Sequence, residues 1–124
     1  MTILNYWRRF KMRVSKFKGK DKAGNWHFGD VLHHDHGVVV IIDDAGKQHK
    51  IIPETRSEFT GSYDYDNHEI FEGDIIQHAK YPAGFLIVFF DDNVCTFAVK
   101  EPKQPLIKKT VANYKIIGNI HDND

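Results

Sequence analysis

Three histidines within four residues, His33-His34-Asp35-His36, form the densest group of metal-ligating side chains in the sequence. In an extended strand His34 and His36 would lie on one face, and imidazole nitrogens are ligands that zinc prefers. A catalytic zinc site needs a third ligand, for which the candidates elsewhere in the chain are His27, His49 and His78. The spacing of these three histidines in the sequence does not determine whether any of them lies at the cluster. The pattern therefore indicates either a metal-dependent hydrolase or a turn with solvated histidines.

A second candidate is the basic and aromatic stretch at residues 1–12. The first 22 residues contain eight basic side chains and one acidic one, whereas the rest of the chain contains nine basic and sixteen acidic ones. Cations beside aromatic rings suit contacts with nucleic acid, and the candidate residues are Trp7, Arg8, Arg9, Lys11 and Arg13. The whole chain has a net charge of zero, which gives no general attraction to nucleic acid. The same arm could instead pack Trp7 and Phe10 against its own domain or a second copy.

Other reactive patterns are weak. Cys95 lies within an alternating strand pattern, where a buried thiol is the common case, and a lone cysteine suits a reducing cytosol. The stretch Asp64–Glu69 resembles a calcium loop but lacks its glycine and distal glutamate. There is no phosphate-binding glycine loop and no zinc-finger spacing. The sequence therefore predicts no catalytic residue and no cofactor.

The elements that position these residues are expected to be short strands. Val38–Asp43 and Phe85–Phe90 are continuous apolar runs, typical of strands buried on both faces. Further strands are predicted at Trp26–His33, His49–Ile52, Ile75–Ala79, Val94–Val99 and Tyr114–Ile120. Aspartate, asparagine and glycine mark the turns between them. About nine strands at roughly ten-residue spacing predict a single mainly β domain over residues 13–124, built from antiparallel meanders as a small barrel.

Two further features concern the organisation of the chain. Ile3, Leu4, Trp7 and Phe10 would share one face of a short helix in the N-terminal arm. Gly29-Asp30 and Gly73-Asp74 each precede an apolar pair, so residues 19–32 and 61–76 form a weak internal repeat. Glycine permits a sharp entry into a strand, and aspartate accepts backbone N–H groups there, so a structural role is expected for both pairs.

Several motifs follow one another along the chain: Phe17-Lys18-Gly19, Asn25–Asp30, Pro53-Glu54-Thr55, Glu58–Gly61, Glu69–Ile76 and Tyr114–His121. In this order they resemble the motifs of the YopX-like family of phage and prophage proteins. The resemblance covers roughly residues 13–122 and leaves out the arm. One departure is Asp66-Asn67, where the family usually has Asn-Gly. The structural motif residues are Gly29, Asp30, Pro53, Gly61, Gly73, Asp74 and Gly118.

The resemblance implies a mainly β fold of SH3-like barrel character and supplies no activity, so no catalytic residue is carried over. The apolar runs are too short to cross a membrane, and the N-terminus lacks a signal-peptide pattern. We expect a non-enzymatic interaction module in the bacterial cytoplasm, which self-associates and binds a host or phage macromolecule and no membrane. The alternatives are nucleic-acid binding through the arm and metal-dependent hydrolysis at His33–His36.

Overall fold

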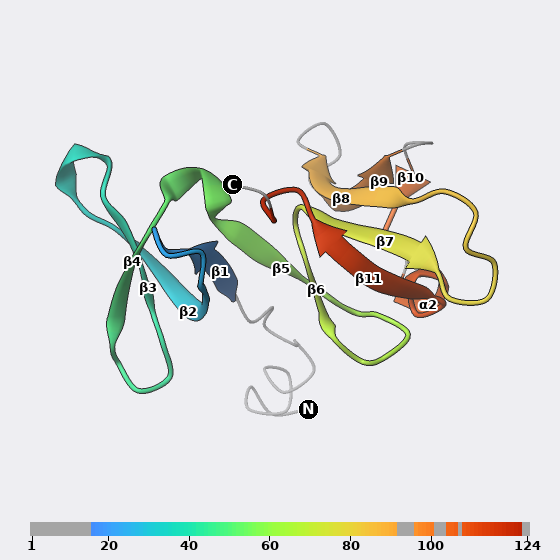
Figure 1. Cartoon of the computed structure of the whole chain (residues 1–124), viewed down its shortest axis with the longest axis horizontal. Helices are drawn as coiled ribbons and strands as arrows, with labels where there is room; N and C mark the ends of the chain where they lie inside the picture. The colour runs from blue at the N-terminus through green and yellow to red at the C-terminus, as the bar shows by residue number, and fades with distance from the viewer. Residues whose placement is uncertain (1–15, 92–95, 101–103, 107, 123–124) are drawn as a thin grey trace, which may run out of the picture.

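The computed structural model describes residues 16–91, 96–100, 104–106 and 108–122. The N-terminal arm, together with the short helix expected in it, lies outside these residues. Within them, strands and turns account for most of the chain (Figure 1).

Six strands form the first sheet: β1 (Phe17–Lys20), β2 (Trp26–His33), β3 (Val39–Ile42), β4 (Gln48–Ile51), β5 (Ser57–Tyr63) and β6 (Glu69–Phe71). Their order is β4-β3-β2-β1-β5-β6, and every pair is antiparallel. Two 3-10 turns, η1 (Asp35–Gly37) and η2 (Pro53–Thr55), connect β2 to β3 and β4 to β5. One face of this sheet buries a core of Val39, Ile41 and Ile51, against which Phe17 and Val31 pack.

Five strands form the second sheet: β7 (Asp74–His78), β8 (Leu86–Asp91), β9 (Thr96–Lys100), β10 (Gln104–Pro105) and β11 (Tyr114–Asn119). Their order is β10-β9-β8-β7-β11, again antiparallel. A four-residue helix, α2 (Lys108–Val111), precedes β11. The second core consists of Ile70, Ile76, Val88 and Val111.

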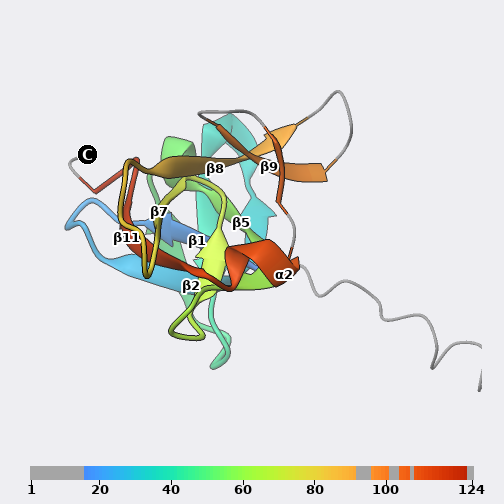
Figure 2. The same ribbon diagram turned by 90° about the vertical axis from the view of Figure 1, so that its right-hand side faces the viewer.

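The two sheets form two lobes that lie side by side, with β5 running between them (Figure 1). Viewed from the end of the second lobe, the first sheet lies behind the second (Figure 2). The strand pair β5–β6 belongs to both lobes, because β5 pairs with β1 whereas Ile70 of β6 is buried in the second core. The lobes therefore share a strand pair rather than a flexible linker.

The expectation of a mainly β, antiparallel fold is confirmed. Most predicted strands lie within one or two residues of the observed ones, and Trp26–His33 is identical to β2. Val39, Val40 and Ile41 are all buried, as expected for a strand covered on both faces. The strand β5 was not predicted, because Ser57–Tyr63 is mostly polar and contains Gly61. The helix α2 was not predicted either; its residue Val111 anchors it in the second core.

The expected closed barrel is not formed in the described part of the chain. In the first sheet the chain after β4 returns to β1, where the Ile52 backbone N–H donates to the Lys20 carbonyl at 2.7 Å. No ladder follows from this bond, and β4 and β6 are the ends of the strand order. The reason is that β5 pairs with β6 on its far side, and β6 leads into the second lobe.

Three hairpin turns have one and the same construction. They begin at Asp21, Asp43 and Asp64, and in each the aspartate Oδ1 accepts the backbone N–H groups two and four residues later, at 2.8–3.0 Å. The fourth residue is left-handed in each: Gly24 at φ 88°, Gly46 at φ 80° and Asn67 at φ 64°. Asn67 thus takes the glycine position, which explains how this chain tolerates its departure from the family's Asn-Gly turn.

Candidate functional site

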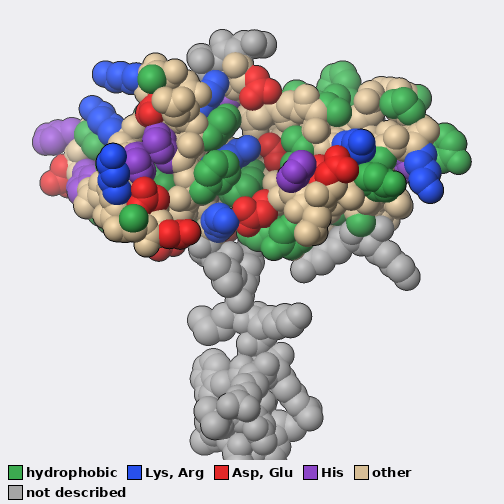
Figure 3. Space-filling view, turned by 60° about the horizontal axis from the view of Figure 1, so that its bottom comes forward, with side chains coloured by type: hydrophobic (Ala, Val, Ile, Leu, Met, Phe, Trp, Pro, Cys, Tyr) green, Lys and Arg blue, Asp and Glu red, His purple; other side chains and the backbone are tan. Residues whose placement is uncertain are grey.

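The residues predicted from sequence to bind a partner are placed as follows. Trp7, Arg8, Arg9, Lys11 and Arg13 lie outside the described residues. His34 and His36 are exposed where β2 ends and η1 begins, and His36 is left-handed at φ 63°. Histidine side chains gather at the outer end of the first lobe in Figure 3.

The metal-ligating atoms that do lie close together belong to residues other than His34 and His36. Among the described residues, the group of three or more metal-ligating side chains is Asp64, Asp66 and His68. Both oxygens of Asp64 already accept backbone N–H groups, and its Oδ2 accepts that of Ile116 at 3.1 Å. Asp64 therefore braces the turn and fastens it to β11. Zinc binding by His34 and His36 remains a prediction.

Half of the basic side chains counted in the first 22 residues can be located, and three of them are engaged. The Lys16 ammonium pairs with Glu69 at 2.9 Å. Lys18 and Lys20 are buried, with exposed fractions of 8% and 5%. Only Lys22 of these four extends freely into solvent within the described chain. The positive charge near the N-terminus is therefore partly internal, which the sequence alone did not reveal.

The buried lysines lie at the junction between the lobes. Asp74 at the start of β7 is 2% exposed and accepts three hydrogen bonds. Its Oδ1 accepts from the Lys18 ammonium at 3.2 Å and from Asn119 Nδ2 at 2.9 Å, and its Oδ2 accepts from the Phe71 backbone N–H at 2.7 Å. One carboxylate thus connects β1, β6, β7 and β11.

Lys20 makes a parallel connection to the C-terminal segment. Its ammonium donates to the His121 carbonyl at 2.6 Å, and its backbone N–H donates to Thr55 Oγ1 at 2.9 Å. The Trp26 ring lies beside both lysines, with its centroid 4.5 Å from the Lys18 ammonium and 5.6 Å from that of Lys20. Cation–π attraction in this position offsets part of the desolvation of the two ammonium groups.

Electrostatics at the junction are dominated by burial. Burial raises the pKa of the Asp74 carboxyl, and this outweighs the opposing attraction of Lys18 and the hydrogen bonds from Phe71 and Asn119. An ion pair of this kind is a poor source of net stability, yet removing one partner strands the other in an apolar setting. All three donors point at the buried Asp74 carboxylate, so the arrangement holds the strands of the junction together.

The other motif residues also have structural places. Gly29 approaches β3 so closely that a Cβ atom would overlap the Ile42 carbonyl oxygen. Gly61 and Gly118 lie at irregularities in the β5–β6 and β11–β7 pairings. Gly73 links β8 to the C-terminal segment: its backbone N–H donates to the Val88 carbonyl, and its carbonyl accepts the Ile120 N–H. Pro53 begins η2.

The two Gly-Asp pairs of the weak repeat differ in their surroundings. Asp74 is buried in the junction, whereas Asp30 is exposed in the middle of β2. A clearer repeat is Asp-x-Ala-Gly-x-x-His, at Asp21–His27 and again at Asp43–His49. This signal is visible in the sequence but was missed there.

In both copies of that repeat the histidine side chain forms a hydrogen bond with the aspartate that begins the turn. His27 Nε2 lies 2.8 Å from Asp21 Oδ2, and His49 Nε2 lies 2.8 Å from Asp43 Oδ2. The two imidazole rings stack on each other, with centroids 3.9 Å apart. The hydrogen bond with His27 and that from the Asn25 N–H lower the pKa of Asp21 to about 2, and His49 lowers that of Asp43 in the same way. The pairs fasten the two hairpins of the first lobe together.

A chain of aromatic rings reaches the surface beside the junction. Phe28 and Phe59 both contact the buried ring of Phe71, at centroid distances of 5.7 and 5.6 Å, and Tyr63 contacts Phe59 at 5.7 Å. Phe28 and Tyr63 are 44% and 45% exposed, whereas Phe71 is 2% exposed. These four rings are called the aromatic face below. Figure 3 shows hydrophobic side chains exposed across the middle of the molecule, between the two lobes.

No described helix has the length and apolar character needed to cross a membrane.

Comparison with known proteins agrees with the motifs. No curated protein matches the chain. Among protein families, the one described as YopX protein matches residues 14–124, which include every motif residue at the junction. The chain therefore belongs to the YopX protein family.

Proposed function

We propose that this chain is a non-enzymatic interaction module, encoded by a phage or prophage, that acts in the bacterial cytoplasm. It self-associates and binds a host or phage macromolecule. The observation that supports this proposal is the aromatic face, in which the exposed ring of Phe28 packs on buried Phe71, and that of Tyr63 packs on Phe59, which also contacts Phe71. Protein interfaces are enriched in aromatic side chains that are held in place by such packing.

The geometry suits recognition better than chemistry. Phe28 and Tyr63 come from β2 and β5, so their positions are fixed by the first sheet rather than by a loop. Rings held in one orientation lose little conformational entropy on binding. Aromatic side chains that form one contiguous exposed group on a folded domain are a common mark of a contact surface.

Self-association can be measured by sedimentation equilibrium on the full chain. We expect the Phe28→Ser/Tyr63→Ser variant to associate at least about tenfold more weakly, because hot-spot truncations cost about 1–2 kcal/mol or more. Tyr81→Ser is the matched control, since Tyr81 is 74% exposed on the β7–β8 loop and lies outside the aromatic face. The proposal would be contradicted if wild type and double variant associated equally strongly. It would also be contradicted if the dissociation constant of the wild-type dimer were above about 1 mM.

The two alternatives from sequence are separated by simple binding measurements. Labelled single- and double-stranded DNA, with a chain lacking residues 1–12 as control, tests the arm. Binding at low salt that disappears with the deletion would favour nucleic acid. Elemental analysis of tag-free protein tests the histidine cluster, and a stoichiometric metal that is lost in His34→Ala/His36→Ala would favour the hydrolase.

A further inference from the structure

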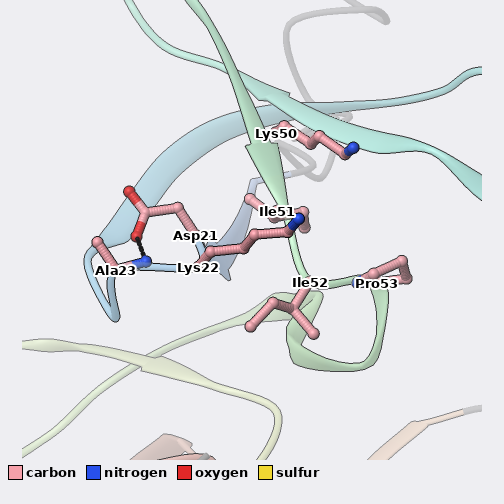
Figure 4. A pocket seen from close by; sticks show the side chains of 7 residues that line it. All are labelled: Asp21, Lys22, Ala23, Lys50, Ile51, Ile52 and Pro53. Atoms are coloured by element: carbon pink, nitrogen blue, oxygen red, sulfur yellow. Dashed lines mark hydrogen bonds between the residues drawn. The ribbon is translucent and has the colours of Figure 1, made fainter.

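A pocket of about 500 Å³ lies in the first lobe, between the first hairpin turn and the end of β4. Figure 4 shows Asp21, Lys22 and Ala23 on one side and the segment 50–53 on the other. Its volume is within the range of pockets that hold a small ligand or the side chains of a bound segment.

The lining is apolar, with cations at the rim. Ile51, Ile52, Pro53 and Ala23 supply the apolar surface. Lys22 and Lys50 are both exposed, and in Figure 4 the Lys22 side chain extends from the turn across Ile51. Neither ammonium has a hydrogen bond or ion pair to any described residue, whereas Lys16, Lys18 and Lys20 all have one.

The one acidic group in the lining is already occupied. Asp21 accepts the N–H groups of Ala23 and Asn25 and is bound to His27, so all of its strong contacts lie within its own hairpin. It stays ionised down to a low pH, because its pKa is about 2. The charged groups at this pocket that have no partner among the described residues are therefore the Lys22 and Lys50 ammonium groups. Their charge is complementary to an anionic partner.

We propose that this pocket binds an acidic segment of a partner protein. One large aliphatic or aromatic side chain of the segment fills the apolar pocket, and carboxylates on either side pair with Lys22 and Lys50. The inference rests on the proposed function, that this chain binds a macromolecule, and it names the site and the chemistry of the partner.

The test uses a fluorescein-labelled peptide with one leucine between glutamates, followed by fluorescence anisotropy at low salt. The pocket is filled by Ala23→Trp, and its charge is reversed by Lys22→Glu/Lys50→Glu. The equivalent hairpin turn that begins at Asp43 supplies matched controls. Its Ala45 corresponds to Ala23 of the first turn and does not line the pocket. Ala45→Trp and Lys47→Glu therefore change the same kinds of exposed side chain elsewhere.

We expect Ala23→Trp to abolish binding and the double charge reversal to weaken it about tenfold, as two screened surface ion pairs would allow. Ala45→Trp and Lys47→Glu leave it unchanged. A peptide with alanine in place of leucine binds at least about fivefold more weakly, since the loss is several methylene groups.

Several results would overturn the site. One is that the glutamate–leucine peptide does not bind. Another is that Ala23→Trp and Ala45→Trp weaken its binding equally, and a third is that the alanine peptide binds as tightly as the leucine peptide. A single-stranded oligonucleotide that binds more tightly than the peptide and is indifferent to Ala23→Trp would assign the lysines to phosphate instead. If any of these occurs while the aromatic-face variants still lose self-association, the site is wrong and the proposed function stands.

Discussion

Replacing Asp74 with asparagine tests whether the buried carboxylate is what joins the two lobes. All three groups that reach Asp74 are donors: the Lys18 ammonium, the Asn119 amide and the Phe71 backbone N–H. An asparagine has one acceptor oxygen, so its own NH₂ group must face at least one of these donors. The substitution also leaves the Lys18 charge buried without a counter-charge.

The magnitude follows from burial rather than from distance. Breaking a buried ion pair by removing one partner costs about 3–5 kcal/mol, a large part of the roughly 5–15 kcal/mol expected for a domain of this size. Lys18→Met keeps the aliphatic stem against Trp26 and leaves Asp74 two of its three donors, so we expect about 2–3 kcal/mol. The double variant should be more stable than the sum predicts, by about 1 kcal/mol or more.

The assay is urea unfolding followed by circular dichroism, at several pH values. Because burial raises the pKa of Asp74, its carboxyl holds a proton to a higher pH in the folded chain than in the unfolded one. The stability from this group is therefore fully present below the unfolded pKa and is lost as the pH rises through the folded pKa. Asp74→Asn cannot titrate, so this part of the pH dependence should vanish. If it folds too poorly to measure, Lys18→Met and the double variant still give the comparison.

Lys16 provides the control. Its ammonium lies 2.9 Å from Glu69, closer than Lys18 lies to Asp74, but the two side chains are 36% and 30% exposed. Lys16→Met should therefore cost less than about 1 kcal/mol. A loss as large as that of Lys18→Met, or strict additivity of Asp74→Asn and Lys18→Met, would refute the role assigned to the junction.

Three further predictions concern the turns and the close approach of strands. Asp21→Asn should lower the melting temperature at neutral pH, and its difference from wild type should vanish as the pH falls from about 4 towards 2. The reason is that the lowered pKa of Asp21 gives a stability that is complete above this window and is lost as the pH falls through it. Gly29→Ala should lower the free energy of unfolding, measured in urea, by about 2–4 kcal/mol, because the added Cβ would overlap a β3 carbonyl oxygen. Gly61→Ala should lower it by only about 1–2 kcal/mol, because the added Cβ meets open space and the cost comes from the backbone at φ 83°. Asn67→Gly should change the unfolding free energy by less than about 0.5 kcal/mol and Asn67→Ala should cost about 1 kcal/mol, because the position is left-handed; equal losses would show that the turn does not depend on its backbone conformation.

The strands were predictable where the pattern of side chains matched their burial. Val38–Asp43 gave a continuous β-branched run, and β3 is buried on both faces. The strand β5 gave no such signal, since its polar residues are used locally: Thr60 Oγ1 donates to the Ile70 carbonyl and accepts the Ser62 N–H. Side-chain hydrogen bonds within an irregular strand pair leave no periodic pattern to read. For the same reason the sequence could not show that β5 leads into a second lobe rather than closing a barrel.

The junction was hidden for a different reason. Lysine in a strand is normally a solvated residue, so Lys18 and Lys20 were counted as part of a basic N-terminal region. Their burial depends on Asp74 and on the His121 carbonyl, which are 56 and 101 residues further along the chain. Only the fold brings these groups together. By contrast, the Asp-x-Ala-Gly-x-x-His repeat is local and could have been found, because each aspartate contacts residues of its own turn.

The junction and the proposed pocket are connected through one residue. The backbone of Lys20 accepts the Ile52 N–H and donates to Thr55, while its ammonium reaches the His121 carbonyl. Asp21 and Lys22 follow directly on one wall of the pocket, and Ile52 and Pro53 form the other. The backbone bonds of Lys20 thus fix the distance between the walls, whereas its side chain connects them to the second lobe. Thr55 and His121, which Lys20 contacts, belong to the family motifs, whereas Lys22 and Lys50 lie outside those motifs and supply the free charges of the pocket.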